Sequence, residues 1–234
     1  MALLQLARQI LGAQSGATVR QLGIAEAVLL QRTAASAIEG TLYRPLMCLI
    51  LQGAKTVSSG DITVQCKAGH SIIVSHDLPV LSKITQASIN EPYIALVIPL
   101  DLSILRSFYD ELAHEQVAQL PVRAMATHGP NSDLLDCALR LLRLSTQPSA
   151  VPLLGPLLTR EIHARLLLSV QGASLRRFLS RDDPSTQLAH AIRSIKSSLQ
   201  NPLSITELSQ MVGMSKSAFH AHFKAVIGLS PGQY

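Results

Sequence analysis

The side chains with the clearest chemical potential lie near the C-terminus, where Lys216, His220 and Lys224 recur every four residues. On a helix this spacing places them on one face, with Ser217 beside them and Ser215 at the start. Lysine ammonium groups bind phosphate oxygens, and serine and histidine contact phosphates or base edges. The pattern predicts a DNA-binding face. The alternative is an ordinary helical hairpin whose lysines are merely solvated.

A second polar set lies in the N-terminal half and comprises Tyr43, Lys55, His76 and Lys83. A phenol, two ammonium groups and an imidazole could together line a polar pocket for a small molecule. For each of the four, the alternative is a surface or turn residue without a ligand. The residues do not identify an effector.

The sequence gives no basis for a metal site, a cofactor or a catalytic reaction. The β segment contains no His-x-His pair, and its His70 and His76 lie six residues apart. His220 and His222 are separated by one residue on a predicted helix and so point to different sides. Cys48, Cys66 and Cys137 are widely spaced in apolar surroundings, which predicts buried, reduced thiols. No serine or cysteine triad, P-loop or dinucleotide-binding glycine pattern is present, so we expect a protein that is not an enzyme.

The C-terminal polar face requires two helices to position it. Ser204 and Glu207 form a capping box that opens the first helix, and Gly213 supplies a turn. Ser215 caps the second helix and Gly228 ends it. A short helix, a glycine turn and a second helix are typical of a helix-turn-helix unit. The expected inward residues of the second helix are Phe219, Phe223, Val226 and Ile227.

Upstream, short β runs between residues 22 and 100 alternate with turn residues, and this favours an antiparallel β-barrel or sandwich. The intervals are too short for helices between the strands, so a parallel α/β sheet is not expected. The predicted strands are Ile24–Gln31, Met47–Gln52, Lys55–Ser58, Ile62–Cys66, Ser71–Ser75, Val80–Gln86 and Tyr93–Ile98.

After Pro99 the apolar period becomes helical. We expect helices from Asp101 or Ser103 to about Gln116, from Asn131 or Ser132, and after Pro152. The segment Arg181–Pro184 is polar and contains a proline, which predicts a linker, and Asp183 is expected to cap the helix that follows. Leu3, Leu6 and Ile10 predict a short amphipathic helix at the N-terminus.

Composition narrows the class of protein. Of 234 residues, 47% are hydrophobic and 15% charged, which excludes a mostly disordered chain. The longest apolar run, Ile94–Leu100, is too short to span a bilayer, so no membrane association is expected. The N-terminus lacks the pattern of a signal peptide, which predicts a cytoplasmic protein. The net charge of +5 allows an anionic partner such as DNA.

Several motifs together resemble the AraC/XylS-type transcriptional regulators, including a subgroup with an AraC-type N-terminal domain. The resemblance implies an α+β fold, with an N-terminal antiparallel β-barrel (cupin-like) that senses an effector, a helical connector and an all-α helix-turn-helix unit. The implied boundaries are 1–125, 126–181 and 182–234. The motifs are Tyr43–Cys48, Gln52–Lys55, His76–Val80, Ala87–Ser88, Glu91–Tyr93, Pro152–Ile162, Glu207–Ser209, Met211–Ser215, Phe219, His222–Lys224, Gly228 and Ser230–Tyr234.

Two features depart from the family pattern. The resemblance implies a second helix-turn-helix unit after Ser230–Tyr234, where this sequence ends, so we expect weak DNA binding by a monomer. Ala221 stands where relatives commonly carry an arginine, which removes a charge-assisted contact. The expected partners are double-stranded DNA, a small-molecule effector, and a second copy or a full-length relative in a mixed dimer. The alternative function is a truncated sensor and dimerisation protein without productive DNA binding.

Overall fold

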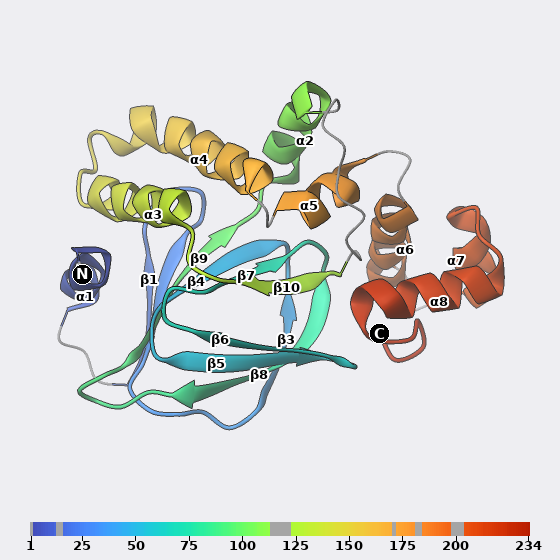
Figure 1. The fold of residues 1–234 in the computed structure, drawn as a ribbon, viewed down its shortest axis with the longest axis horizontal. Helices are drawn as coiled ribbons and strands as arrows, with labels where there is room; N and C mark the ends of the chain where they lie inside the picture. Colours follow the sequence, from blue (N-terminus) through green and yellow to red (C-terminus); the bar gives the residue numbers. More distant parts are fainter. Residues whose placement is uncertain (1, 13–15, 113–122, 170–171, 181–183, 198–203) are drawn as a thin grey trace.

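A computed structural model describes residues 2–12, 16–112, 123–169, 172–180, 184–197 and 204–234. Two β-sheets form the lower part of the molecule, and helices cover its upper side (Figure 1). A smaller group of helices from the C-terminal part lies beside the sheets (Figure 1). The fold is therefore α+β, as the sequence predicts.

The described strands pair antiparallel throughout and form two sheets, as in the sandwich alternative of the prediction. They do not close into one barrel, which corrects the barrel alternative. The six-stranded sheet has the order β1 (Ala17–Gln21), β2 (Val28–Arg32), β9 (Tyr93–Pro99), β4 (Leu46–Gln52), β7 (Ser71–Val74) and β10 (Met125–His128). The four-stranded sheet has the order β3 (Glu39–Tyr43), β8 (Leu78–Gln86), β5 (Ala54–Ser59) and β6 (Ile62–Lys67).

The pattern of buried and exposed residues along each strand depends on whether one or both faces of the strand are covered. Along β6, buried Ile62, Val64 and Cys66 alternate with exposed residues, as expected for a strand with one face on the core. In β4 and β9, which lie in the middle of the six-stranded sheet, the buried residues form nearly continuous runs because both faces are covered.

Each of the seven predicted strands overlaps an observed strand, and two observed strands are shorter than predicted: β7 ends one residue earlier, at Val74, and β2 begins four residues later. In the stretch Ile24–Gln31, pairing begins only at Val28 because residues 24–27 form a tight turn, in which the Ala27 amide donates to the Ile24 carbonyl at 2.8 Å. Ala25 and Glu26 have φ values of 50° and 54°, the geometry of a primed turn. Strands β1, β3 and β10 were not predicted.

Five helices lie above or beside the sheets: α1 (Ala2–Leu11), α2 (Leu102–Leu112), α3 (Ser132–Ser145), α4 (Val151–Leu168) and α5 (Gly172–Leu179). Asn131 caps α3 as predicted, accepting a hydrogen bond from the Leu134 amide at 3.1 Å. Leucines of α3 and α4 pack with the outer face of the six-stranded sheet in one apolar core. Within the described ranges, no helix combines the length and hydropathy that a bilayer crossing requires.

The last three helices are α6 (Pro184–Ser197), α7 (Ile205–Met211) and α8 (Lys216–Ile227). Their buried residues share a second apolar core with the facing sides of the two sheets, including Val57 and Ile62 of the four-stranded sheet. Some predictions lie outside the described residues: the linker at residues 181–183 with its Asp183 cap, and the helix end near Gln116.

Candidate DNA-binding surface and sensor interior

Helices α7 and α8 begin as their sequences predict. The Ser204 hydroxyl accepts from the Glu207 amide at 3.2 Å, and the Glu207 carboxylate accepts from the Ser204 amide at 2.7 Å. Gly213 adopts φ 65° in the turn between the helices, and the Ser215 hydroxyl accepts from the Ala218 amide. Gly228 ends α8 in the left-handed conformation. These caps fix where the second helix starts and stops.

Helix α8 has two contrasting faces. Phe219 and Phe223 are fully buried, their ring centroids lie 5.6 Å apart, and the Tyr234 ring lies at the same distance from Phe223. The predicted DNA-binding residues all lie exposed on the helix or at its N-terminal cap: Ser215, Lys216, Ser217, His220 and Lys224. Ala221 is exposed among them, and His222 is half-buried at the edge of the core. The polar set therefore lies together on one accessible face.

The C-terminal end of α8 docks against the turn between β5 and β6. The Asp61 amide donates to the Gly228 carbonyl at 3.2 Å, and the Ser59 hydroxyl donates to the Ile227 carbonyl at 3.2 Å. A Cβ atom on Gly60 would lie 1.9 Å from the Gly228 oxygen, so only glycine fits there in this arrangement. Two segments separated by more than 160 residues thus meet backbone to backbone.

Asp77, which precedes β8, holds a second contact between the sheets and the C-terminal helices. Its carboxylate forms an ion pair with Lys196 of α6, and its carbonyl accepts from the Tyr234 hydroxyl at 2.9 Å. A third contact joins the residue before β10 to α8, where the Ala124 amide donates to the Val226 carbonyl at 2.8 Å. No sequence pattern predicted these contacts, because each joins residues far apart in the chain.

Lys55 and Tyr43 lie together in the interior between the two sheets. The Lys55 side chain is 5% exposed, and its Nζ donates to the Tyr43 hydroxyl at 3.3 Å and to the Cys48 Sγ at 3.4 Å. Burial opposes the charge of this ammonium, but the ionisable groups of Cys48, Tyr93 and Tyr43 outweigh burial and raise the pKa of Lys55 well above its usual value. The interior therefore holds a buried ammonium in contact with a phenol and a thiol.

The other two residues of the predicted sensor pocket lie elsewhere. Lys83 is exposed, because its register partner on β5 is Thr56, whereas Lys55 pairs with Ile84. Alternation along the strand therefore places Lys83 on the outer face of the sheet. His76 is buried outside the sandwich, where its ring lies 4.4 Å from that of Phe178 in α5.

The cysteines are buried and free, which confirms the predicted buried thiols. Burial is the main cause that raises the pKa of Cys66 and of Cys137 above the usual thiol value. Among the residues that the structure describes, no group of three histidine, cysteine, aspartate or glutamate side chains is arranged to hold a metal ion.

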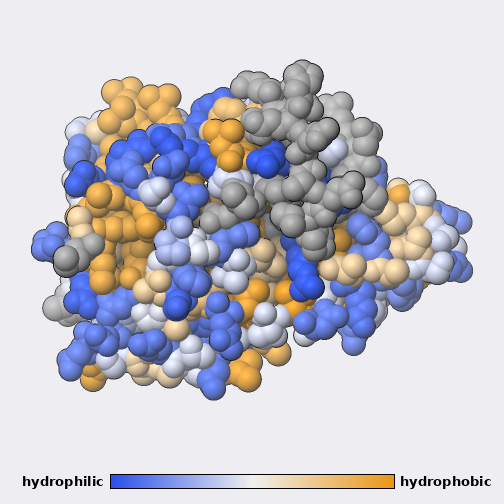
Figure 2. Space-filling view, viewed as in Figure 1, coloured by the Kyte–Doolittle hydropathy of each residue, from blue (hydrophilic) through white to orange (hydrophobic). Residues whose placement is uncertain are grey.

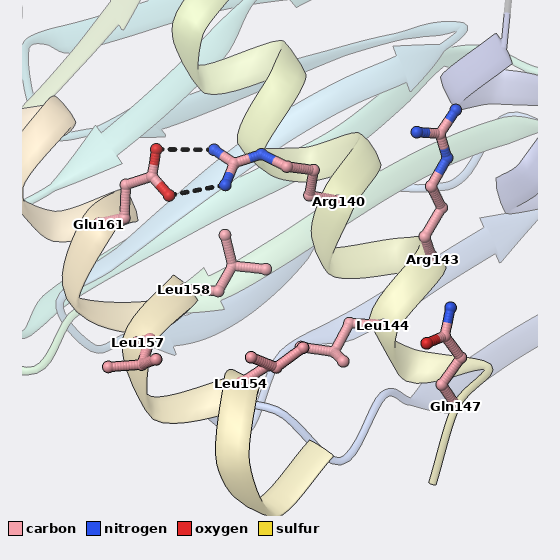
Figure 3. A pocket seen from close by; sticks show the side chains of 8 residues that line it. All are labelled: Arg140, Arg143, Leu144, Gln147, Leu154, Leu157, Leu158 and Glu161. Carbon is pink, nitrogen blue, oxygen red and sulfur yellow. Dashed lines mark hydrogen bonds and ion pairs between the residues drawn. The ribbon is translucent and has the colours of Figure 1, made fainter. Parts of the chain in front are cut away.

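An apolar groove of about 320 Å³ runs between α3 and α4. Figure 3 shows Leu154, Leu157 and Leu158 of α4 on one side and Leu144 of α3 on the other. The ion pair between Glu161 and Arg140 lies at one end of the groove. Figure 2 shows apolar side chains gathered on the surface where α3 and α4 lie. Leu153, Leu154 and Leu157 are between half and three-quarters exposed. This surface is unusual because large apolar side chains normally avoid contiguous exposure.

The structure combines two antiparallel sheets, a covering of helices, and a C-terminal pair of helices with an exposed polar face. Residues 24–174 match the family model for the AraC-type transcriptional regulator N-terminus. Residues 195–234 match the model for bacterial regulatory helix-turn-helix proteins of the AraC family. The chain belongs to the AraC family of transcriptional regulators.

Solved structures with a similar arrangement include the AraC-like transcriptional activator CuxR, with 13% identity over 89% of this chain and 73% of that one, and a TM-score of 0.39. ToxT from Vibrio cholerae, solved with an unsaturated fatty acid, has 10% identity over 88% and 94% of the two chains, and a TM-score of 0.35. No curated protein matches the sequence significantly. The family assignment therefore rests on the two sequence models.

Proposed function

We propose that this regulator binds its operator through α8, which enters the major groove with Ser215, Lys216, Ser217, His220 and Lys224 toward the DNA. The observation that carries this proposal is the exposed polar face of α8 above two fully buried phenylalanines. The buried rings fix the helix, while the ammonium groups are free to meet phosphates. Residues at the start of such a helix are the ones that reach base edges.

Fluorescence anisotropy tests this proposal with labelled DNA from the region upstream of the protein's own gene. We expect tighter binding to this DNA than to a scrambled duplex of equal length, and weaker binding as salt rises. Residues 181–234 carry five basic and three acidic side chains, a net of +2, so one unit alone should bind weakly. Equal affinity for both duplexes at every salt concentration would contradict sequence-specific recognition.

We propose that the sandwich is the effector domain and that Lys55 and Tyr43 are its polar contacts. A buried ammonium whose neighbours are a phenol and a thiol can bind an anionic group once a ligand displaces the Tyr43 or Cys48 contact. Replacing Lys55 with methionine keeps the length of the side chain and removes the charge. We expect K55M to abolish effector-dependent transcription of a reporter, while the exposed-site control K83M retains it.

We propose that two copies associate through the groove between α3 and α4. The exposed leucines of α4 form a ridge beside the groove, so a two-fold pair can place the ridge of each copy in the groove of the other. A dimer also supplies two recognition helices, which compensates for the small charge of one unit. Sedimentation equilibrium over a range of concentrations measures this association, and a monomer throughout would exclude it.

We further propose that residues 1–125, 126–181 and 182–234 act as sensor, connector and DNA-binding unit, respectively. Membership of a family of transcriptional regulators supports a binding protein in the cytoplasm rather than an enzyme. The helices α3 and α4 lie within the proposed connector, where the dimer surface is also placed.

A further inference from the structure

A separate cavity of about 160 Å³ lies where the sheets, the covering helices and the C-terminal helices meet. His76 and Asp77 contribute the wall from the sheets, and Leu102 comes from α2. Phe178 of α5 and Ile192 of α6 close the apolar side, with Ala189 of α6 beside them. The edge of the sheets and the helices α2, α5 and α6 therefore all contribute to one small chamber.

We propose that this junction cavity binds a small organic anion with a compact apolar body. The site is distinct from the Lys55 region, because it lies outside the sandwich and its lining includes neither Lys55 nor Tyr43. Binding of the anion does not depend on the proposed function. The effect of that binding on DNA recognition rests on the proposed function.

The charges around the cavity favour an anion. Arg106 of α2 and Arg193 of α6 both line it and are both exposed, so their guanidinium groups lie at the side open to solvent. The carboxylate of Asp77 also lines the cavity, but Lys196 pairs with it and offsets its charge. The two arginines come from different helices, so an anion between them would face a positive group on either side.

The size and lining of the cavity define the rest of the ligand. A dry engineered cavity of about 150 Å³ holds a benzene molecule, so this cavity accommodates an apolar body of about six heavy atoms. The rings of Phe178 and His76 and the side chains of Leu102 and Ile192 provide apolar contact. A short branched carboxylate meets both requirements, with its carboxylate toward the arginines.

The position of the cavity gives such a ligand a regulatory consequence. Ile192 and Arg193 belong to α6, which leads into α7 and α8, whereas His76 adjoins the Asp77 contact that holds α6 and Tyr234. A ligand that touches both sides at once binds the docked arrangement more tightly than a separated one. It therefore shifts the population toward docking.

The test uses the full chain and 4-methylpentanoate as the probe, with 4-methylpentan-1-ol as the uncharged analogue of the same shape. Isothermal titration calorimetry, in the absence of DNA, measures both. Three variants are compared with the native chain. A189L fills the cavity, R106Q/R193Q removes the two positive groups, and R20Q removes an exposed arginine on the distant strand β1.

We expect saturable binding of the acid, and binding of the alcohol that is weaker by about tenfold. A189L should abolish binding, and R106Q/R193Q should weaken it by about tenfold, because each exposed arginine contributes up to about fivefold. R20Q should stay within a factor of two of the native chain. Thermal unfolding of each variant checks that it is folded.

Equal affinity for acid and alcohol, or undiminished binding in folded A189L, would overturn the proposal. If A189L does not fold, R106Q/R193Q decides, because both arginines are exposed. Failure of DNA binding in the anisotropy experiment would contradict the proposed function but leave this titration unaffected. The two results are therefore distinguishable.

Discussion

Helices α4 and α8 bury apolar stripes in the same way but present opposite surfaces to solvent. Helix α4 buries Leu158, Ile162 and Leu166 and exposes further leucines, so its N-terminal half is apolar on nearly every side. Helix α8 buries Phe219 and Phe223 and exposes lysines, serines and histidine. The buried faces hold both helices in the fold, and the exposed faces differ in the kind of surface that they can bind.

This contrast assigns two kinds of contact to two parts of one molecule. An exposed row of leucines is stabilised by another apolar surface, which we propose is a second copy of α4. A row of ammonium and hydroxyl groups is stabilised by phosphates. Substitutions that affect one surface and leave the other unchanged therefore test the comparison directly.

The largest expected effect comes from the buried side of α8. F223A should lower the free energy of unfolding by about 3–5 kcal/mol, because it removes a fully buried ring and leaves a cavity. The exposed-site counterpart L157A should change it by less than about 0.5 kcal/mol. Urea titration followed by circular dichroism measures both. Similar losses in the two variants would show that α4 is also held by its outward leucines.

The next effect concerns association. L157D places a charge on the apolar surface of α4, and we expect the dimer dissociation constant to rise by more than about tenfold. DNA binding by the isolated unit is not altered directly, because Leu157 is remote from α8. Sedimentation equilibrium measures the constant, with L81D, an exposed leucine on β8, as the matched control. An unchanged constant for L157D would place the dimer contact elsewhere.

A smaller effect is expected at the DNA-binding surface. K216Q/K224Q should reduce the slope of log affinity against log salt by about 2, since each lysine releases about one counterion on binding phosphate. Unfolding should be unaffected, because both side chains are exposed. K83Q on the outer face of the four-stranded sheet is the control. A slope that falls equally in K83Q would indicate a general charge effect.

The smallest effect is a pH dependence beside the α3–α4 groove. Hydrogen bonds from Arg140 and Arg165 lower the pKa of Glu161 to about 2. This carboxylate therefore stabilises the native state above its unfolded pKa of about 4.5, and the stabilisation is lost as the pH falls toward 2. One third of the side chain is exposed, so the contribution is below about 1 kcal/mol.

The variant E161Q tests that pH dependence. Its stability should be lower than that of the native chain at pH 7, and the difference should disappear near pH 2. Urea midpoints across this pH range measure it. A constant difference at all pH values would attribute the effect to packing instead of charge.

Local sequence signals predicted much of the fold. The capping box at Ser204, the cap at Ser215 and the left-handed Gly228 were recognisable because each uses contacts within four residues. The buried strands were recognisable because their apolar residues form alternating or continuous runs. In contrast, β1 and β3 are mostly exposed, so neither carries an apolar pattern that predicts a strand.

Long-range features were not predictable from the sequence. The split into two sheets depends on strand pairing, which no local pattern specifies. The members of the sensor pocket were equally hard to predict. Lys55 pairs with Ile84, and Lys83 is the residue before Ile84, so the side chain of Lys83 lies on the opposite face of the sheet from that of Lys55. The DNA-binding set was easier to predict because all its members lie within ten consecutive residues.

The contact between Gly60 and Gly228 has a genetic consequence. Both have positive φ values, and a methyl group on either would overlap a backbone oxygen of the opposite segment. One altered codon at either position therefore forces α8 away from the sheet while the side chains proposed to contact DNA stay the same. A selection for mutants that no longer respond to the proposed effector should recover changes at these two glycines, far from the residues proposed to contact the operator.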